Sequence, residues 1–201
     1  MANKIKFNTP ESLVYVGLDC ETSSDNFLTG RPIQIGVSIF ASGLLKEYQS
    51  YIFHQEVDDW SAEAENIHHI SPQTLLTAPK AQTVDDELFQ WLNKELDYPA
   101  SNSLVAVGWN VNSFDFHFLK PILPQTMGLF SRRVVELNSL IHLYAQTSLV
   151  AYRTFDELKE IVKSEGRETL DAYNIGGKEH QAAYDAALGL AIFSNLKDLV
   201  R

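Results

Sequence analysis

The sequence contains one cysteine, Cys20, among its 201 residues. A disulfide within the chain is therefore excluded, and a reducing compartment is the natural setting for such a protein. Two further features are missing. The opening residues MANKIKFNTPE contain no apolar signal-peptide core, and the apolar run at 188–193 is far too short to cross a bilayer. We therefore expect a soluble, cytoplasmic protein that does not enter a membrane.

Positive charge is also scarce. The chain has 16 Lys and Arg against 26 Asp and Glu, which gives a formal net charge of −10 at pH 7. Residues 1–119 hold 16 acidic and 6 basic side chains, whereas residues 120–201 hold 10 of each. Tight non-specific binding to duplex nucleic acid requires a basic surface, so that class of protein is not expected. Weaker binding to the end of a nucleic-acid strand, assisted by bound cations, is compatible with this charge.

The remaining composition is that of an ordinary globular protein. Hydrophobic residues make up 45% and charged residues 21% of the chain. No internal repeat, low-complexity tract or linker divides it, so we expect residues 1–201 to form a single domain. The segments 13–20, 32–40 and 46–53 carry β-forming residues and are joined by short connections, which predicts an antiparallel meander.

Helix-start signals dominate after the meander. Ser61 and Ser71 precede helical patterns, with Pro72 at the first position of the second one, and a longer helix is predicted to begin at Thr83. Further strands are predicted at 104–109 and 132–137, and further helices at 114–120 and 181–200. The pattern predicts an α/β fold: a central mixed five-stranded sheet, an antiparallel meander followed by parallel strands, flanked by helices.

Two carboxylates end the first predicted strand, in the segment LDCET. Because side chains two residues apart on a strand point to the same face, Asp19 and Glu21 project together, while Leu18 and Cys20 point to the other face. Two acids on a buried strand repel each other and lose hydration, and a hard divalent cation relieves both costs. The alternative is that the strand simply ends and the acids face water, because D-x-E after an apolar run often occurs by chance.

Asp115 and Asp185 follow in two later segments. Asp115 comes after the loop WNVNSF, just beyond the strand predicted at 104–109. Ligands of open α/β sheets gather at that edge, although an acid in the first turn of a helix also suits the helix dipole without any ligand. Asp185 stands among small residues in HQAAYDA. An acid on a largely buried helix needs a partner, which is either a cation or a nearby Lys or Arg.

His180 precedes Asp185 by five residues. That spacing is about 140° around a helix axis, so the two side chains would not share a face if both were helical. We therefore predict that His180 lies on the loop after the Gly-Gly pair, free to swing over a site to which Asp185 contributes. The alternative is an exposed loop histidine without a role.

Together the three segments resemble the three motifs of the DnaQ-like, or DEDD, 3′→5′ exonuclease superfamily. LDCET is similar to the first motif, WNVNSFDFHFL to the second and HQAAYDA to the third. The third has the H-x-x-x-x-D pattern of the DEDDh branch, because Gln181 stands where the sister branch has tyrosine. PIQIGVSIF and IHHISPQTLL add local similarity, so the resemblance runs from residue 13 to residue 193. Trp109, His69 and Glu136 depart from the family pattern.

The resemblance implies a ribonuclease H-like fold and an enzyme that releases nucleoside 5′-monophosphates from a 3′ end. Asp19, Glu21, Asp115 and Asp185 would hold two divalent ions, magnesium (Mg2+) or manganese (Mn2+). His180 would act as general base, since imidazole exchanges protons near neutral pH. Two such ions stabilise both the attacking and the leaving oxygen of an in-line displacement.

The resemblance also suggests contacts to the terminal nucleotide. The candidate substrate-binding residues are Thr22, Phe114, His68 and Asn110. Trp60 and Trp109 are further candidates for stacking on bases, and Arg167 and Lys178 for meeting phosphates. The ordinary alternatives are core packing for the two tryptophans, a helix-end histidine without a role for His68, and a solvated surface for the two cations.

The expected substrate is single-stranded DNA, with an RNA-directed 3′→5′ exoribonuclease of the same family as an alternative. A second alternative is a nuclease-like module that binds nucleic acid or a polymerase without cutting. A phosphatase with a D-x-D-x-T nucleophile is disfavoured because Glu21 replaces the second aspartate. The short segment after Asp185 favours a stand-alone enzyme, and the sequence leaves open whether it is a monomer or a homodimer.

Overall fold

The computed structural model describes residues 13–147 and 154–199, and within them five strands form one mixed sheet. The strands are β1 (Val14–Thr22), β2 (Pro32–Ala41), β3 (Leu44–Tyr51), β4 (Leu104–Gly108) and β5 (Phe130–Glu136). Their order across the sheet is β3-β2-β1-β4-β5. β1, β2 and β3 pair antiparallel, whereas β4 pairs parallel with both β1 and β5. The predicted meander followed by parallel strands is confirmed.

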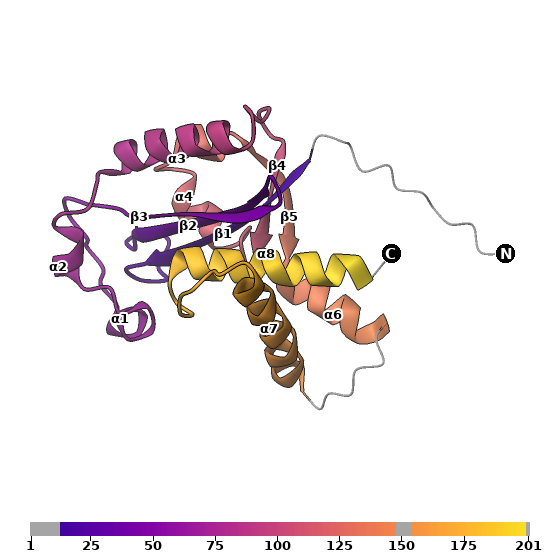
Figure 1. Cartoon of the computed structure of the whole chain (residues 1–201). Helices are drawn as coiled ribbons and strands as arrows, with labels where there is room; N and C mark the ends of the chain where they lie inside the picture. Colours follow the sequence, from indigo (N-terminus) through magenta and orange to yellow (C-terminus); the bar gives the residue numbers. More distant parts are fainter. Residues whose placement is uncertain (1–12, 148–153, 200–201) are drawn as a thin grey trace.

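Helices cover both faces of this sheet (Figure 1). They are α1 (Ala62–His68), α2 (Pro72–Leu75), α3 (Ala81–Glu95), α4 (Asp115–Leu119), α5 (Pro124–Met127), α6 (Leu137–Thr147), α7 (Phe155–Ala172) and α8 (Ala182–Leu199). α3 and α4 share a hydrophobic core with one face, while α8 lies on the other face and packs against α7. The α/β class and the flanking helices are as predicted.

β1 presents different side chains to the two helix layers. Val16, Leu18 and Cys20 are buried in the core shared with α3 and α4. The alternate positions face α8, which lies so close that a Cβ atom on Gly17 would stand 2.0 Å from the carbonyl oxygen of Ala186. Burial of each large aliphatic side chain contributes about 1.5–3 kcal/mol to folding. The hydrophobic face of β1 therefore anchors the strand, and its other face is left free to carry carboxylates.

The approach of α8 to the sheet depends on small residues on both sides. A Cβ atom on Gly36 of β2 would lie 1.9 Å from the carbonyl carbon of Ala182. Ala182 and Ala186 are both fully buried, and the close packing predicted from the small residues of this helix is confirmed. Gly36 pairs with Asp19 across the sheet, so the first turn of α8 lies beside the acidic end of β1.

Several element boundaries differ from the prediction by up to two residues, and among the strands β1 ends at Thr22 rather than Cys20 and β3 spans Leu44–Tyr51 rather than 46–53. The long helix begins at Ala81 rather than Thr83, because Lys80 is the extended N-cap residue and its carbonyl accepts the first helical bond from Val84. β5 begins at Phe130, two residues before the predicted start at Arg132. The caps predicted at Ser61 and Ser71 are confirmed, since both hydroxyls accept backbone N–H groups.

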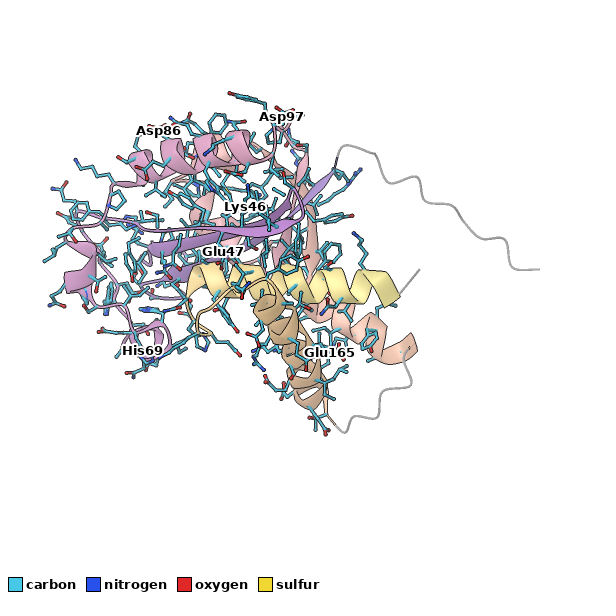
Figure 2. All side chains as sticks on the ribbon, in the orientation of Figure 1. Lys46, Glu47, His69, Asp86, Asp97 and Glu165 are labelled. Carbon is cyan, nitrogen blue, oxygen red and sulfur yellow. The ribbon has the colours of Figure 1, made fainter. Side chains whose placement is uncertain are left out.

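Charged side chains mark the outer surfaces (Figure 2). Lys46 and Glu47 belong to β3, the edge strand, and Lys46 forms an ion pair with Glu95 of α3. Charge on an edge strand hinders pairing with other chains. Asp86 and Asp97 lie on the α3 side of the molecule, away from α8 (Figure 2). Within the described part of the chain, no helix has the length and apolar character needed to cross a membrane.

Candidate active site

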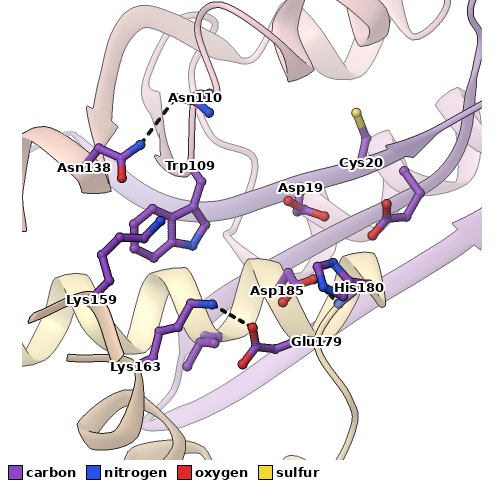
Figure 3. A pocket seen from close by; sticks show the side chains of 12 residues that line it. Asp19, Cys20, Trp109, Asn110, Asn138, Lys159, Lys163, Glu179, His180 and Asp185 are labelled. Carbon is purple, nitrogen blue, oxygen red and sulfur yellow. Dashed lines mark hydrogen bonds and ion pairs between the residues drawn. The ribbon is translucent and has the colours of Figure 1, made fainter. Parts of the chain in front are cut away.

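A pocket opens where the carboxyl ends of β1 and β4 meet the first turn of α8 (Figure 3). Acidic residues and a histidine line one end of it, and aromatic, amide and basic side chains line the other. The first end holds Asp19, Glu21, Asp185 and His180, and the second holds Trp109, Asn110, Asn138 and Lys159. This edge of the sheet is where ligands of open α/β folds are usually bound.

Asp19 and Glu21 alternate with Leu18 and Cys20 along β1, as predicted, and both acids line the pocket. Burial raises the pKa of Asp19 well above its usual value, and repulsion from Asp115, Glu21 and Asp185 adds to the shift. Burial also raises the pKa of Glu21 to about 7, with smaller contributions from Asp185 and Asp115. These carboxyl groups are therefore not freely solvated acids at a strand end.

Asp115 begins α4 directly after the β4 loop and is 2% exposed. Its Oδ1 atom is buried and accepts no hydrogen bond from the described residues. Burial raises the pKa of Asp115 to about 7, although hydrogen bonds from the Cys20 thiol and from backbone N–H groups lower it in part. Asp115 does not line the pocket surface, but it repels Asp19 more strongly than any other acid does. A buried carboxylate oxygen without a donor is costly unless a proton or a cation meets it.

His180 lies on the loop before α8, as predicted, with a left-handed φ of 67°. Its backbone N–H donates to Oδ2 of Asp185 at 2.6 Å. Burial raises the pKa of Asp185 to about 6, against the opposing effect of His180. Within the described residues no Lys or Arg forms an ion pair with Asp185. The alternative prediction for Asp185, an ion pair with a nearby Lys or Arg, is therefore wrong.

The loop that carries His180 is fastened to α7 through Glu179, which was not predicted from the sequence. Lys163 Nζ donates to Glu179 Oε2 at 2.6 Å, and Arg167 forms an ion pair with Oε1. Partial burial opposes ionisation of Glu179, but the two cations outweigh it and hold its pKa below the usual value. Lys163 and Arg167 lie one helical turn apart on the same face of α7, which is the pattern that would have pointed to a shared partner.

Two glutamines that were also not predicted fix the start of α8. Gln34 Oε1 accepts the backbone N–H of Ala182 at 3.0 Å, and Gln49 Oε1 accepts that of Ala183 at 3.2 Å. Gln34 is buried on β2. A buried glutamine in a strand requires a hydrogen-bond partner, and that requirement is the signal that the sequence offered.

The predicted substrate contacts Thr22 and His68 lie next to each other beyond Glu21. Thr22 ends β1 and is buried, and its backbone lies beside the imidazole of His68. Nδ1 of His68 accepts the backbone N–H of Ile70, while Nε2 is buried without a hydrogen-bond partner among the described residues. His69 instead caps α1 with a left-handed φ of 58°. That conformation explains why the resembled family has glycine at this position.

The other two predicted substrate contacts, Phe114 and Asn110, lie in different places. Phe114 is half-buried beside Phe27 and Phe118, with ring centroids 6.0 and 5.0 Å away. Asn110 lines the pocket and accepts a hydrogen bond from Asn138 at 3.4 Å. The structure therefore brings Asn110 to the pocket, whereas Phe114 belongs to a neighbouring aromatic cluster.

The two tryptophans considered for stacking are placed differently from each other. Trp60 packs on a small separate core and donates to Glu65 at 2.6 Å, outside the pocket. Trp109 lines the pocket. Of the two cations considered for phosphates, Lys178 is an exposed loop residue and Arg167 is committed to Glu179 and Glu160.

The acidic end of the pocket fits a divalent cation. One ligand atom from each of Glu21, His180 and Asp185 lies within 4.8 Å of the other two. Oxygen ligands from several carboxylates are the donor set that hard cations prefer. A cation bound there would supply the countercharge that the unpartnered oxygen of Asp115 and the four acids with raised pKa values lack.

Comparison with known proteins identifies the family. The sequence matches the family described as Exonuclease (RNase_T) over residues 16–193. The chain belongs to this exonuclease family. The DnaQ-like relationship predicted from the three motifs is thereby confirmed. Among curated proteins, no sequence match to this chain is found.

Solved nuclease structures share the fold of this chain. Cell-death related nuclease 4 (CRN-4) has a TM-score of 0.63 at 15% identity, covering 92% of this chain and 64% of that one. Escherichia coli exonuclease I in complex with a dT13 oligonucleotide has a TM-score of 0.63 at 14% identity, covering 92% and 41%. Exonuclease X in complex with 5′ overhanging duplex DNA has a TM-score of 0.55 at 15% identity, covering 92% of each chain. The chain thus spans less than two thirds of the length of the first two.

Proposed function

We propose that this protein is a 3′→5′ exonuclease that releases nucleoside 5′-monophosphates from single-stranded DNA by metal-dependent hydrolysis. The observation that carries the proposal is the gathering of Asp19, Glu21, Asp185 and His180 at one end of a pocket, with Asp115 directly behind it. We further propose that residues 1–201 act as one exonuclease domain, of which residues 16–193 match the family.

The four acids are the proposed holders of two divalent ions, Mg2+ or Mn2+. Without a cation, burial and mutual repulsion disfavour their charged forms, as the raised pKa values of Glu21, Asp115 and Asp185 indicate. When bound, such ions stabilise negative charge on phosphodiester oxygens. A metal-free pocket of four acids would repel a phosphodiester, so cation binding precedes or accompanies substrate binding.

His180 is the proposed general base. Its backbone is held by Asp185 and its loop by Glu179, while the side chain lines the pocket next to Glu21. This arrangement supports removal of a proton from a water molecule that attacks the phosphorus, since a base must lie within hydrogen-bond reach of the proton that it takes.

The terminal nucleoside is proposed to bind beyond Glu21. Thr22 and His68, whose imidazole lies against the Thr22 backbone, are the proposed polar contacts there. Phe114 and its neighbour Phe27, which is 45% exposed, offer apolar rings. Asn110 lies on the opposite side of the acids, where it would meet the strand rather than the terminal nucleoside.

Digestion of 5′-labelled oligonucleotides tests this function. With Mg2+ or Mn2+, single-stranded DNA should shorten one nucleotide at a time from its 3′ end, and a chelator should stop the reaction. Asp185→Asn should lower the rate at least about 100-fold, because it removes the charge of a proposed metal ligand and weakens the hydrogen bond that holds the His180 backbone. Asp86→Asn, a change to a half-buried acid on α3 that does not line the pocket, is the matched control.

Three results would contradict the proposal in different ways. Faster digestion of a matched RNA than of DNA would favour the exoribonuclease. Endonucleolytic products would overturn the direction of attack. Metal-dependent binding without release of any nucleotide would favour the non-catalytic module.

A further inference from the structure

The pocket continues past the acids to Trp109 and Lys159, for which the proposed chemistry has no use (Figure 3). Trp109 follows β4, and Lys159 of α7 places its Nζ 4.9 Å from the centre of the indole ring. The amides of Asn110 and Asn138 lie beside them and are bonded to each other. A ring, a cation and two amides thus form the end of the pocket opposite His180.

Lys159 differs from the other lysine of the pocket. Lys163 is bound by Glu179 and also pairs with Glu160 at 3.7 Å. Lys159 forms no ion pair within the described part of the chain, and its ammonium group lies over the face of Trp109. A contact between an ammonium group and an aromatic face is weak in a half-exposed position. Lys159 is therefore available to an anion in a pocket whose other lysine is already neutralised.

The position of Trp109 relative to the acids is fixed by strand pairing. Gly108, the residue before Trp109, would bring a Cβ atom within 2.6 Å of the carbonyl oxygen of Leu18, the residue before Asp19. β4 therefore ends beside Leu18, and Trp109 follows it at the level where β1 continues to Asp19. Thr22 and His68 lie in the other direction, beyond Glu21.

We propose that Trp109 and Lys159 bind the nucleotide on the 5′ side of the scissile phosphodiester. This inference rests on the proposed function, which places the 3′-terminal nucleoside beyond Glu21 and the scissile phosphate at the acids. The next phosphate along the strand draws Lys159 off the ring, and a base stacks on the indole face that Lys159 leaves. Asn110 and Asn138 meet the sugar or the base edge.

The chemistry of a single strand fits this end of the pocket. Such strands are held by aromatic rings that stack on bases and by cations that follow the backbone, largely without regard to sequence. A duplex keeps its bases stacked on each other and offers the indole no free face. The site also provides local positive charge to a chain with a net charge of −10.

Two substrates separate this site from the catalytic centre. Thymidine 5′-monophosphate methyl ester has a terminal nucleotide and only a methyl group on the 5′ side of its phosphate, whereas oligothymidylate has a further nucleotide there. For Trp109→Leu, we expect kcat/KM to fall about tenfold on the oligonucleotide, in line with the loss of one base stack. On the ester we expect less than about twofold change, because the ester does not reach the indole.

Lys159→Gln tests the phosphate contact by salt dependence. Each phosphate neutralised on a single strand adds about 0.7 to the slope of log affinity against log salt concentration. The slope for oligothymidylate, measured with Ca2+ in place of the activating ion, should fall by about 0.7 in this variant. Lys94→Gln, at a lysine with an 81% exposed side chain on α3, is the matched control and should leave the slope unchanged.

Each result bears on the proposal in a definite way. Equal losses on the ester and the oligonucleotide, or no loss on either, would overturn the site but not the function. A wild-type protein that hydrolyses neither substrate would overturn the function and this site with it. Ester turnover by the variants also shows that they are folded.

Discussion

At the scale of single residues, Asp115 is a buried acid of the candidate site that lowers the stability of the folded protein. Its Oδ1 atom is buried without a donor, and its pKa is raised to about 7 chiefly by burial. Asp85 is an equally buried acid with the opposite character, because it accepts the backbone N–H groups of Gln125 and Thr126 at 3.0 and 2.9 Å. Asp85 therefore stabilises the fold, whereas Asp115 destabilises it.

Asparagine substitutions at these two positions should therefore act in opposite directions. Asp115→Asn removes a buried charge, so the metal-free protein should become more stable at pH 8, while nucleotide release falls at least about 100-fold. Asp85→Asn should destabilise the protein by about 1–3 kcal/mol, since it weakens two buried hydrogen bonds. Urea unfolding and the exonuclease assay measure the two effects. A loss of stability in Asp115→Asn would contradict this account of the site.

Glu179 is expected to act on catalysis only through its neighbour His180. Glu179→Gln weakens the ion pairs with Lys163 and Arg167, so the loop should hold His180 less firmly. We expect kcat to fall by about three- to tenfold with KM unchanged, because a misplaced base affects the chemical step rather than binding. Glu168→Gln, at an exposed acid of the same helix that forms no ion pair within the described residues, should have no effect. A change confined to KM would contradict a positioning role.

The sequence located the acids but not the residues that hold them in place. Asp19 and Glu21 follow from strand parity, which is a local rule, and His180 follows from its spacing to Asp185. Glu179 and Gln34 act on partners far away in the chain. Their roles depend on which elements meet in space, and local patterns do not contain that information.

At the scale of elements, the site exists because α8 lies unusually close to β1 and β2. The small residues of α8 predicted a close approach, but the matching glycines on the strands became meaningful only when the helix was placed over them. Gly17 and Gly36 leave no room for a Cβ atom under this helix. The start of α3 was predicted two residues late because Lys80 has no side-chain capping bond that a sequence pattern could reveal.

Gly17→Ala tests this contact. The added carbon would lie 2.0 Å from the carbonyl oxygen of Ala186, which belongs to the backbone of a buried helix and cannot turn aside. We expect a loss of about 2–4 kcal/mol in the free energy of unfolding, at or above the usual range for overpacking. Gly176→Ala is the matched control, since a Cβ atom there meets nothing within 4 Å. Equal urea midpoints for the two variants would show that α8 is free to move away from the sheet.

At the scale of the whole molecule, the raised pKa values of the acids link stability to both pH and metal. Glu21, Asp115 and Asp185 have folded-state pKa values of about 7, about 7 and about 6. Between about pH 4 and pH 7 the folded state therefore binds more protons than the unfolded state, and stability falls as pH rises. Burial lowers the pKa values of His54 and His68, and these groups oppose the trend near pH 6.

The metal-free protein should consequently unfold at a lower temperature at pH 8 than at pH 5, and the decrease should be smaller in Asp115→Asn. The wild type and Asp115→Asn contain the same histidines. The difference between their decreases in unfolding temperature therefore isolates the contribution of Asp115. Millimolar Mg2+ or Mn2+ should raise the unfolding temperature more at pH 8 than at pH 5, because a cation binds the ionised acids of the folded state and competes with protons for them. Each kcal/mol corresponds to about 2–4 °C in a protein of this size, so thermal unfolding resolves the effect. Equal stabilisation by metal at both pH values would mean that the cation binds elsewhere, and the assignment of the four acids would then fail even if the protein were an exonuclease.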